Sequence, residues 1–238
     1  MKRLILSTLT AASLTMALVG VTSAAAPDVE NGSFETGTNP GVFTQLTAPD
    51  SINIASWTVS SGTVDYIGTY WQAADGVRSI DLNGTSAGAV RQSITTESGK
   101  TYKVSFSLSG NPEGGVGIKT MTADVGATPI AFSYEVGALN TRAGMKWAAK
   151  SFTFVAAAAT TALTFTSTST TAGAFGPALD KVRVELVNAN AASAKAFAVC
   201  KKGGWKELRD GAGGAFRNQG DCVSYFATKL RNGAAGAR

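Results

Sequence analysis

The chain has 238 residues and a formal net charge of +5 at pH 7, with 16% charged and 44% hydrophobic residues. It contains no histidine, which excludes catalysis by an imidazole base and metal centres with imidazole ligands. The 27 glycines and frequent threonines and serines favour a turn-rich β protein.

The N-terminus has the pattern of a secretory signal peptide. Lys2 and Arg3 precede an apolar run, Leu4–Val21, and small residues follow it. This predicts cleavage after Ala24 or Ala25. The alternative is a membrane anchor, which the serines and threonines of the run disfavour. We therefore expect a secreted or extracellular protein without a membrane span, with the bacterial periplasm or the cell surface as other possible locations.

Alternation of apolar and polar residues predicts strands through most of the chain up to residue 187. In Thr101–Ser109, Tyr102, Val104, Phe106 and Leu108 fall on one face and polar residues on the other. Further strands are expected at 56–60, 63–67, 79–82, 89–95, 118–125, 151–155, 162–166 and 179–186. Many short strands separated by turns, without a convincing helix, predict an all-β, jelly-roll β-sandwich.

The segment Asp65–Gly76 concentrates three aromatic residues in six positions. Tyr66 shares a strand face with an apolar neighbour, so we expect it in the core. Tyr70 and Trp71 are adjacent, and adjacent side chains of an extended chain point to opposite sides. At least one of these two rings is therefore expected at the surface or at a rim.

Several stretches together resemble a known family: Asn31–Glu35, Asp65–Gly76, Ser79–Gly84, Leu108–Pro112, Lys119–Thr120, Trp147 and Gly176–Asp180. This is the domain of unknown function 642, found in plant cell-wall proteins and in bacterial secreted proteins called choice-of-anchor C. The likeness covers about residues 29–186. It implies a galactose-binding-like β-sandwich and, for the plant members, association with wall polysaccharide and wall-modifying enzymes without known catalysis.

The first and last motifs also resemble xylanase-type carbohydrate-binding modules, in which a Glu and an Asp meet at a structural calcium ion. That resemblance implies Ca²⁺ at Glu35 and Asp180, with Asp75 and the backbone of Arg78 as further ligands. Calcium takes six to eight oxygen ligands, which carboxylates and loop carbonyls supply. The alternatives are that Glu35 binds backbone amides and that Asp180 pairs with an arginine.

The predicted function is non-catalytic binding of cell-wall or extracellular polysaccharide. Tyrosine and tryptophan offer flat apolar faces together with a polar group, which suits sugars. The candidate binding residues are Tyr70, Trp71, Gln72, Arg78, Asn111 and Trp147.

Two other functions remain open. One is an extracellular-matrix or adhesion protein that binds protein partners. The other is a polysaccharide hydrolase or lyase, which needs two facing carboxylates. Asp65, Asp75, Asp81 and Glu113 are available, but their spacing singles out no pair.

The C-terminal part differs from the rest of the chain in charge. From Cys200 onward there are eight Lys or Arg and three Asp or Glu residues, which favours an anionic glycan or the cell envelope as partner, or simply a solvated surface. Nucleic acid is not expected for an exported protein. Cys200 and Cys222 predict a disulfide, and Asp221 is expected to cap a helix.

This C-terminal part resembles a CKxGGW…NQGDCV element that recurs at the ends of bacterial exported proteins. The predicted divisions of the chain are a signal peptide (1–25), the sandwich (26–188), a linker (189–199), a small basic Cys-bridged unit (200–232) and a disordered tail (233–238).

Overall fold

The computed structural model describes residues 29–126, 128–170, 173–187, 199–209 and 214–227, and of Phe226 and Ala227 it describes the backbone alone. The predicted signal peptide with Ala24 and Ala25, most of the predicted linker and the predicted tail lie outside the described residues.

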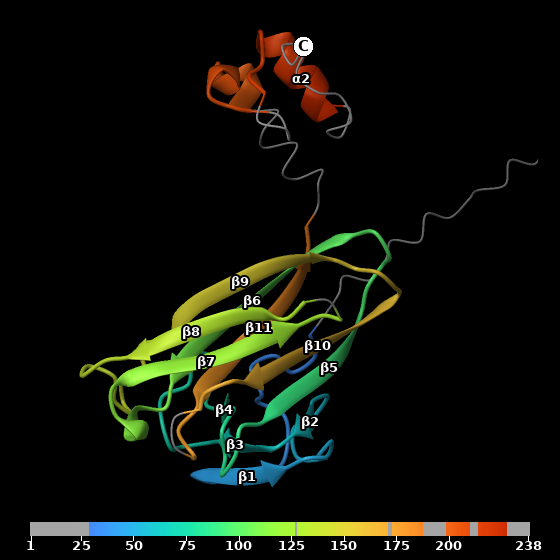
Figure 1. The fold of residues 1–238 in the computed structure, drawn as a ribbon. Coiled ribbons are helices and arrows are strands. Elements are labelled where there is room, and N and C mark those ends of the chain that lie inside the picture. The colour runs from blue at the N-terminus through green and yellow to red at the C-terminus, as the bar shows by residue number, and fades with distance from the viewer. Residues whose placement is uncertain (1–28, 127, 171–172, 188–198, 210–213, 228–238) are drawn as a thin grey trace, which may run out of the picture.

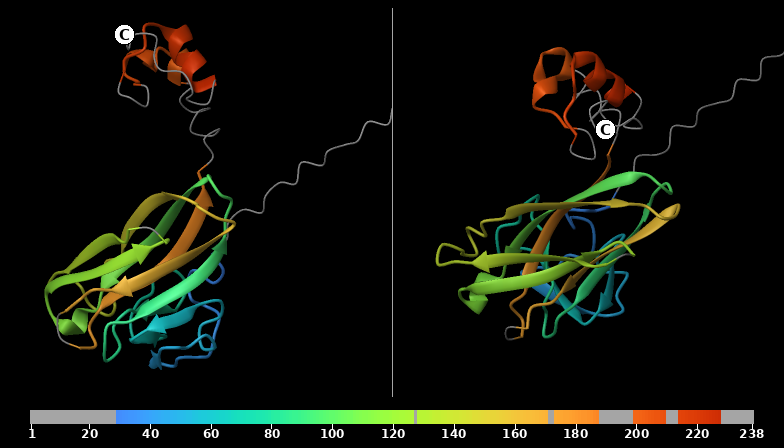
Figure 2. Two further views of the ribbon diagram at one scale, coloured as in Figure 1. Left: turned by 45° about the vertical axis from the view of Figure 1, so that its right-hand side comes forward. Right: turned by 45° about the horizontal axis from the view of Figure 1, so that its top comes forward.

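The described residues up to 187 form a β-sandwich of two antiparallel sheets that lie face to face (Figures 1 and 2). The six-stranded sheet contains, in order across it, β1 (Phe43–Thr47), β3 (Thr63–Ile67), β4 (Ser79–Asp81), β11 (Pro177–Leu186), β6 (Thr101–Gly110) and β9 (Ala148–Val155). The five-stranded sheet contains β2 (Thr58–Ser61), β5 (Ala89–Thr95), β10 (Thr160–Ser167), β7 (Gly117–Asp124) and β8 (Ile130–Val136). The predicted sandwich is confirmed.

Most strands lie where alternation predicts them. β3 and β5 have the predicted bounds, and the other predicted strands differ by at most three residues at either end. β1 and β8 were not predicted. In β1 only Leu46 is buried, so the strand carries little apolar signal. In β8 the half-buried Phe132 and Tyr134 do alternate with exposed residues, and this pattern could have identified the strand.

The core between the sheets consists of the inward residues of both. Phe106 of β6 contacts Phe165 of β10 edge to face, with ring centroids 5.2 Å apart. Trp57 lies 6.4 Å from Phe165 by the same measure and is 1% exposed. Tyr66 is fully buried in this core, which confirms its prediction as a core residue. Burying aromatic side chains of this size supplies much of the hydrophobic stabilisation of a sandwich.

The outer face of the six-stranded sheet is partly covered by loops. Along each strand, the residues that alternate with the inward-facing ones point to this outer face. They include Asp65 of β3 and its cross-strand neighbour Asp81 of β4. A second apolar cluster forms on the same face from Ile67, Trp71, Met145 and Ala178. Trp71 from the segment after β3 and Met145 from the segment after β8 supply part of this cover, so polar groups of the sheet are enclosed there.

The C-terminal unit is a small disulfide-linked structure. Cys200 and Cys222 are bonded, as predicted, with Cα atoms 5.9 Å apart. Both are fully buried, and Phe216 and Tyr225 pack with them. The unit contains η2 (Gly204–Lys206) and α2 (Gln219–Ala227). Among the described residues, no helix combines the length and the hydropathy needed to cross a membrane.

The predicted cap of α2 is wrong. The helix begins at Gln219, two residues before Asp221. The side-chain Oδ1 of Asn218 accepts a hydrogen bond from the backbone N of Asp221 (2.8 Å), so Asn218 is the capping residue. The Asp221 carboxylate lies in the first turn, where the helix dipole favours negative charge.

Candidate functional site

A cavity of about 90 Å³ opens on the outer face of the six-stranded sheet. We call it the aromatic pocket, and its lining residues are Phe43, Asp65, Ile67, Tyr70, Asn111, Ala174 and Phe175. They come from β1, from β3 and the loop after it, from the residue after β6 and from the segment before β11. The pocket is therefore built where four distant parts of the chain meet.

The walls of the aromatic pocket include three aromatic rings, of Phe43, Tyr70 and Phe175. Phe43 and Tyr70 meet edge to face at 5.2 Å between centroids, and Phe43 remains 46% exposed. The guanidinium carbon of Arg142 lies 4.2 Å from the centre of the Tyr70 ring. Arg142 Nε is held in turn by Glu113 Oε1 at 2.7 Å. These contacts position the Tyr70 ring beside a partly exposed apolar surface.

Asp65 is the charged group of the aromatic pocket. Its side chain lies on β3, in which every residue is buried, and is 8% exposed. Burial raises the pKa of this carboxyl from 3.8 to about 6. Its Oδ1 is buried and accepts no hydrogen bond from the described residues. A buried polar atom without a partner is unfavourable, so Asp65 is the group here that a ligand could satisfy.

Asp81 lies opposite Asp65 and is fully buried, but its oxygens have partners. Oδ1 accepts hydrogen bonds from the backbone N atoms of Asn83 (2.9 Å) and Gly176 (3.0 Å). Oδ2 accepts one from Asn111 Nδ2 (2.8 Å). Burial, with a smaller contribution from the Asp65 charge, raises the pKa of Asp81 to about 8. Asp81 therefore fixes Asn111 and the segment before β11 at the pocket.

Gly176 allows this arrangement through its lack of a side chain. A Cβ atom there would lie 2.5 Å from Asp81 Oδ1 and 2.6 Å from Asn83 Oδ1, too close for any other residue. Lys119 of β7 is also enclosed, with 3% exposure, and burial lowers the pKa of its ammonium while the charge of Asp81 raises it. The pocket thus has a charged and polar base beneath aromatic walls.

The residues predicted to bind calcium lie apart from the aromatic pocket. They belong to a region that we call the acid turn, which consists of Glu35, Ala74–Arg78 and Asp180. Glu35 Oε1 accepts hydrogen bonds from the backbone N atoms of Val77 (2.8 Å) and Arg78 (2.7 Å). Asp180 Oδ2 accepts them from Ala74 (2.7 Å) and Asp75 (2.9 Å), and its Oδ1 accepts one from Lys181 N (2.6 Å). These carboxylates hold the loop through its amides.

Asp75 completes the acid turn with side-chain contacts. Its Oδ2 accepts a hydrogen bond from Ser33 Oγ (2.9 Å) and lies 3.5 Å from Arg183 Nη2. Complete burial raises the pKa of Asp180 to about 7, although three backbone N–H groups lower it.

This donor set does not fit calcium in the observed arrangement. Glu35 Oε1 and both oxygens of Asp180 face N–H donors, and Arg78 offers its N–H to Glu35. Calcium needs oxygen ligands that converge on one point, and the described residues form no group of three acidic, Cys or His side chains that could hold a metal ion. The alternative of amide binding by Glu35 describes the contacts seen. Calcium binding stays a prediction.

Two of the predicted binding residues, Tyr70 and Asn111, meet in the aromatic pocket. Trp71 does not belong to a solvent-facing surface. It is 5% exposed, and its Nε1 donates a hydrogen bond to Ser79 Oγ (2.7 Å). The reason is that the loop after β3 folds back on the sheet, which turns the Trp71 ring into the apolar cluster on the outer face and leaves Tyr70 at the rim.

The other predicted residues serve the surrounding loops. Trp147 is half-buried and its Nε1 donates to the carbonyl of Gln72 (2.9 Å), whose side chain is exposed. Arg78 donates from Nη1 to the hydroxyl of Tyr66 (2.6 Å) and to the carbonyl of Gly37 (3.3 Å). The structure brings none of these three side chains into the lining of the aromatic pocket.

Sequence reasoning did not assign Phe43, Asp65 and Phe175 to the binding site. Asp65 carried a signal, because an acidic residue between Val64 and Tyr66 interrupts a run in which every residue is buried. Phe43 belongs to an unpredicted strand. Phe175 lies in a glycine-rich loop with no pattern of its own. These positions meet only through the order of strands across the sheet.

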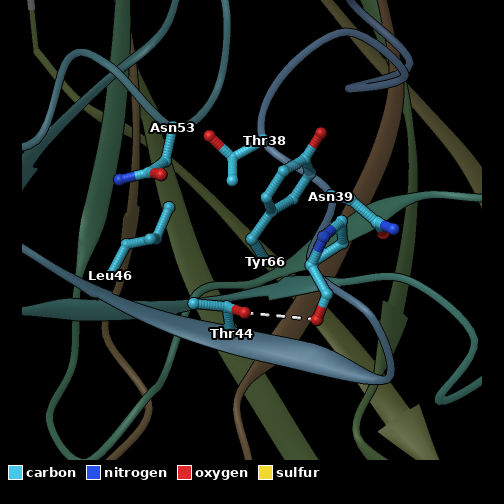
Figure 3. Close-up of a pocket in the computed structure, with 7 residues that line it drawn as sticks. Thr38, Asn39, Thr44, Leu46, Asn53 and Tyr66 are labelled. Carbon is cyan, nitrogen blue, oxygen red and sulfur yellow. Dashed lines mark hydrogen bonds between the residues drawn. The ribbon is translucent and has the colours of Figure 1, made fainter.

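A smaller cavity lies beside β1, lined by Thr38, Asn39, Pro40, Thr44, Leu46, Asn53 and Tyr66 (Figure 3). Its volume of about 10 Å³ is about the least that can hold one water molecule. Thr44 Oγ1 donates to the carbonyl of Pro40 across its edge (3.2 Å). This space is too small for a sugar.

Comparison with known proteins gives a family and one curated relative. The family described as "Protein of unknown function (DUF642)" matches residues 28–185. Halomucin of Haloquadratum walsbyi is 36% identical over 177 residues. That match spans 71% of this chain but only 2% of halomucin.

Solved structures with detectable likeness include carbohydrate-binding modules. The module TmCBM61, solved with β-1,4-galactotriose, has 15% identity and a TM-score of 0.41, covering 66% of this chain and 97% of the module. The CBM35 of Paenibacillus barcinonensis has 16% identity and a TM-score of 0.38, covering 59% of this chain and 97% of the module.

Proposed function

We propose that this chain, which belongs to the DUF642 family, is an exported glycan-binding protein and that its aromatic pocket holds the sugar. The observation that carries the proposal is the unpaired Oδ1 of Asp65, buried in a cavity with aromatic walls. A disulfide supports the exported location, because such bonds persist in oxidising compartments.

The chemistry of the aromatic pocket suits a sugar. A pyranose ring offers C–H groups to aromatic faces and hydroxyl groups to polar atoms at its edge. Phe43, Tyr70 and Phe175 supply the faces. Asp65 supplies an acceptor without a partner, and Asn111 stands beside it, fixed by Asp81. Binding sites of this kind are mostly apolar with a few placed polar groups.

The neighbouring carboxylates do not favour catalysis. Asp81 is fully buried and accepts three N–H hydrogen bonds, so it fits a positioning role better than proton transfer to a ligand. Glu113, the other acidic residue near the pocket, is paired with Arg142. We therefore propose binding without hydrolysis, and we assign the basic C-terminal unit to an anionic glycan or the cell envelope.

The test is binding to a panel of cell-wall and extracellular polysaccharides, followed by titration calorimetry on those that bind. Tyr70→Ala should weaken binding at least tenfold, about 1.4 kcal/mol, through loss of a stacking face. Trp205→Ala, which removes a half-buried ring of the C-terminal unit, is the control and should leave the affinity for glycans without negative charge unchanged.

Three results would contradict the proposal. The first is binding of a glycan without negative charge that is lost in Trp205→Ala but kept in Tyr70→Ala. The second is capture of protein partners without binding of any glycan, which favours the matrix or adhesion function. The third is release of reducing sugar by the intact protein that stops in Asp65→Asn, which favours a hydrolase.

A further inference from the structure

We propose that the sugar bound at the aromatic pocket is a single amino-sugar unit whose protonated amine binds the Asp65 carboxylate. This inference rests on the glycan-binding function proposed above and narrows it to a class of ligand. It depends on which charges around the pocket already have a partner, on the nature of the walls and on the size of the cavity.

The charges around the aromatic pocket leave Asp65 uncompensated. Glu113 and Arg142 form an ion pair with each other. Asp81 accepts three N–H hydrogen bonds, and the nearby ammonium of Lys119 interacts with Asp81. Asp65 Oδ1 has neither a hydrogen bond nor an ion pair with any described residue. The negative charge that remains open to a ligand is therefore that of Asp65.

An amine satisfies this group better than a hydroxyl does. A sugar hydroxyl would give Asp65 a hydrogen bond but leave its charge uncompensated in a poorly solvated site. A protonated amine gives both a hydrogen bond and the opposite charge, and such charge-assisted bonds are about twice as strong as neutral ones. A uronic acid would bring a second carboxylate toward Asp65 and would be repelled.

The walls of the pocket also favour a cation. The faces of Phe43, Tyr70 and Phe175 are electron-rich, and aromatic faces attract an ammonium group within about 6 Å. The Tyr70 ring already has Arg142 over it at 4.2 Å, whereas the Phe43 ring, which contacts Tyr70 edge to face, keeps 46% of its surface exposed. Asp65 and the rings thus act on the same ligand group.

The size of the aromatic pocket limits how much of a glycan enters. About 90 Å³ is well below the roughly 300 Å³ at which clefts begin to enclose larger organic ligands. Only part of one sugar unit, such as its amine-bearing edge, fits such a space, with the rest of the chain outside. The pocket therefore suits a chain end or a side branch better than an internal stretch of a linear polysaccharide.

The experiment is calorimetric titration of the full chain at pH 7 with sugar trimers of equal length. One series contains the trimers of glucosamine, N-acetylglucosamine and glucose. The second series contains the trimers of galactosamine, N-acetylgalactosamine and galactose. The glucosamine or galactosamine trimer should bind at least tenfold more tightly than its acetylated and neutral counterparts. Asp65→Asn should reduce this preference to within about twofold, and Tyr70→Ala should weaken all trimers that bind.

The outcomes separate this inference from the proposed function. Neutral trimers that bind as tightly as the amino sugars, with binding lost in Tyr70→Ala, overturn the amine preference and keep glycan binding at the pocket. A preference for amines that survives in Asp65→Asn also overturns the inference, because the cation then binds elsewhere. Affinities that neither Tyr70→Ala nor Asp65→Asn alters contradict both proposals.

Discussion

The acid turn and the aromatic pocket place buried carboxylates on strands of the same sheet, yet the two regions differ in how those carboxylates are satisfied. At the acid turn, Asp180 accepts three backbone N–H hydrogen bonds. At the aromatic pocket, Asp65 Oδ1 accepts none from the described residues. The first arrangement is complete and holds a loop in place. The second is incomplete in the free protein, which is typical of groups kept for a ligand at the expense of stability.

The largest effect is expected from removing the carboxylate of the acid turn. Asp180→Ala removes a fully buried carboxylate and leaves three part-buried backbone N–H groups without their acceptor. Because each unsatisfied buried group costs about 1–3 kcal/mol, the free energy of unfolding should fall by about 3 kcal/mol or more. Urea denaturation measures it, and a loss below about 0.5 kcal/mol would show that the amides do not depend on Asp180.

Neutralising the Asp65 carboxylate should raise the free energy of unfolding, whereas removing Asp180 lowers it. The pKa of Asp65 is raised from 3.8 to about 6, so the folded state binds a proton more tightly than the unfolded state does. The free energy of unfolding therefore falls as the pH rises from about 4 to 6, and the full destabilisation by the ionised carboxylate is present above pH 6. Asp65→Asn removes this cost, about 3 kcal/mol at 1.4 kcal/mol per pKa unit.

The check on Asp65→Asn is urea unfolding of both proteins at pH 4 and pH 8. The variant should match the wild type at pH 4 and exceed it at pH 8. The raised pKa values of Asp81 (about 8) and Asp180 (about 7) act in the same direction, so the wild type itself should be less stable at pH 8 than at pH 5. A variant that is less stable at pH 8 would show that Asp65 is already satisfied in the folded protein.

A smaller effect is expected at Trp71. Trp71→Phe keeps an aromatic ring in the apolar cluster but removes the Nε1 hydrogen bond to Ser79 Oγ. The free energy of unfolding should fall by about 1–2 kcal/mol, and glycan affinity should stay within twofold of the wild type. A large loss of glycan affinity without a fall in the free energy of unfolding would show that Trp71 takes part in binding.

The smallest effect is expected from metal removal. Because the acid turn is held by amide donors, EDTA should leave the midpoint of thermal unfolding unchanged within about 1 °C. Ligand binding to the folded state raises the midpoint in proportion to the logarithm of its concentration over Kd. A fall of several degrees with EDTA, restored by added Ca²⁺, would confirm the calcium prediction and mean that the loop rearranges around the ion.

Alternation in the sequence predicted the sandwich and many of its inward faces, because a strand with one buried face repeats every two residues. This holds for Tyr66 and for the apolar face of β6. The site was predicted only in part. Tyr70 and Asn111 were named, whereas Phe43 and Phe175 reach the pocket through the pairing of β1 with β3 and of β11 with β4, which no local pattern encodes. The burial of Trp71 likewise depends on how its loop folds back.

The most direct test uses one protein, Asp65→Asn, for two measurements. Its free energy of unfolding is measured at pH 8 and its glycan affinity at pH 7. If Asp65 is kept unpaired for a ligand, glycan affinity should fall at least tenfold while the free energy of unfolding rises by about 3 kcal/mol. If the free energy of unfolding rises while the glycan affinity falls, misfolding is ruled out as the cause of the weaker binding. Unchanged affinity in a more stable variant would contradict the role of Asp65 as the ligand's partner in the aromatic pocket.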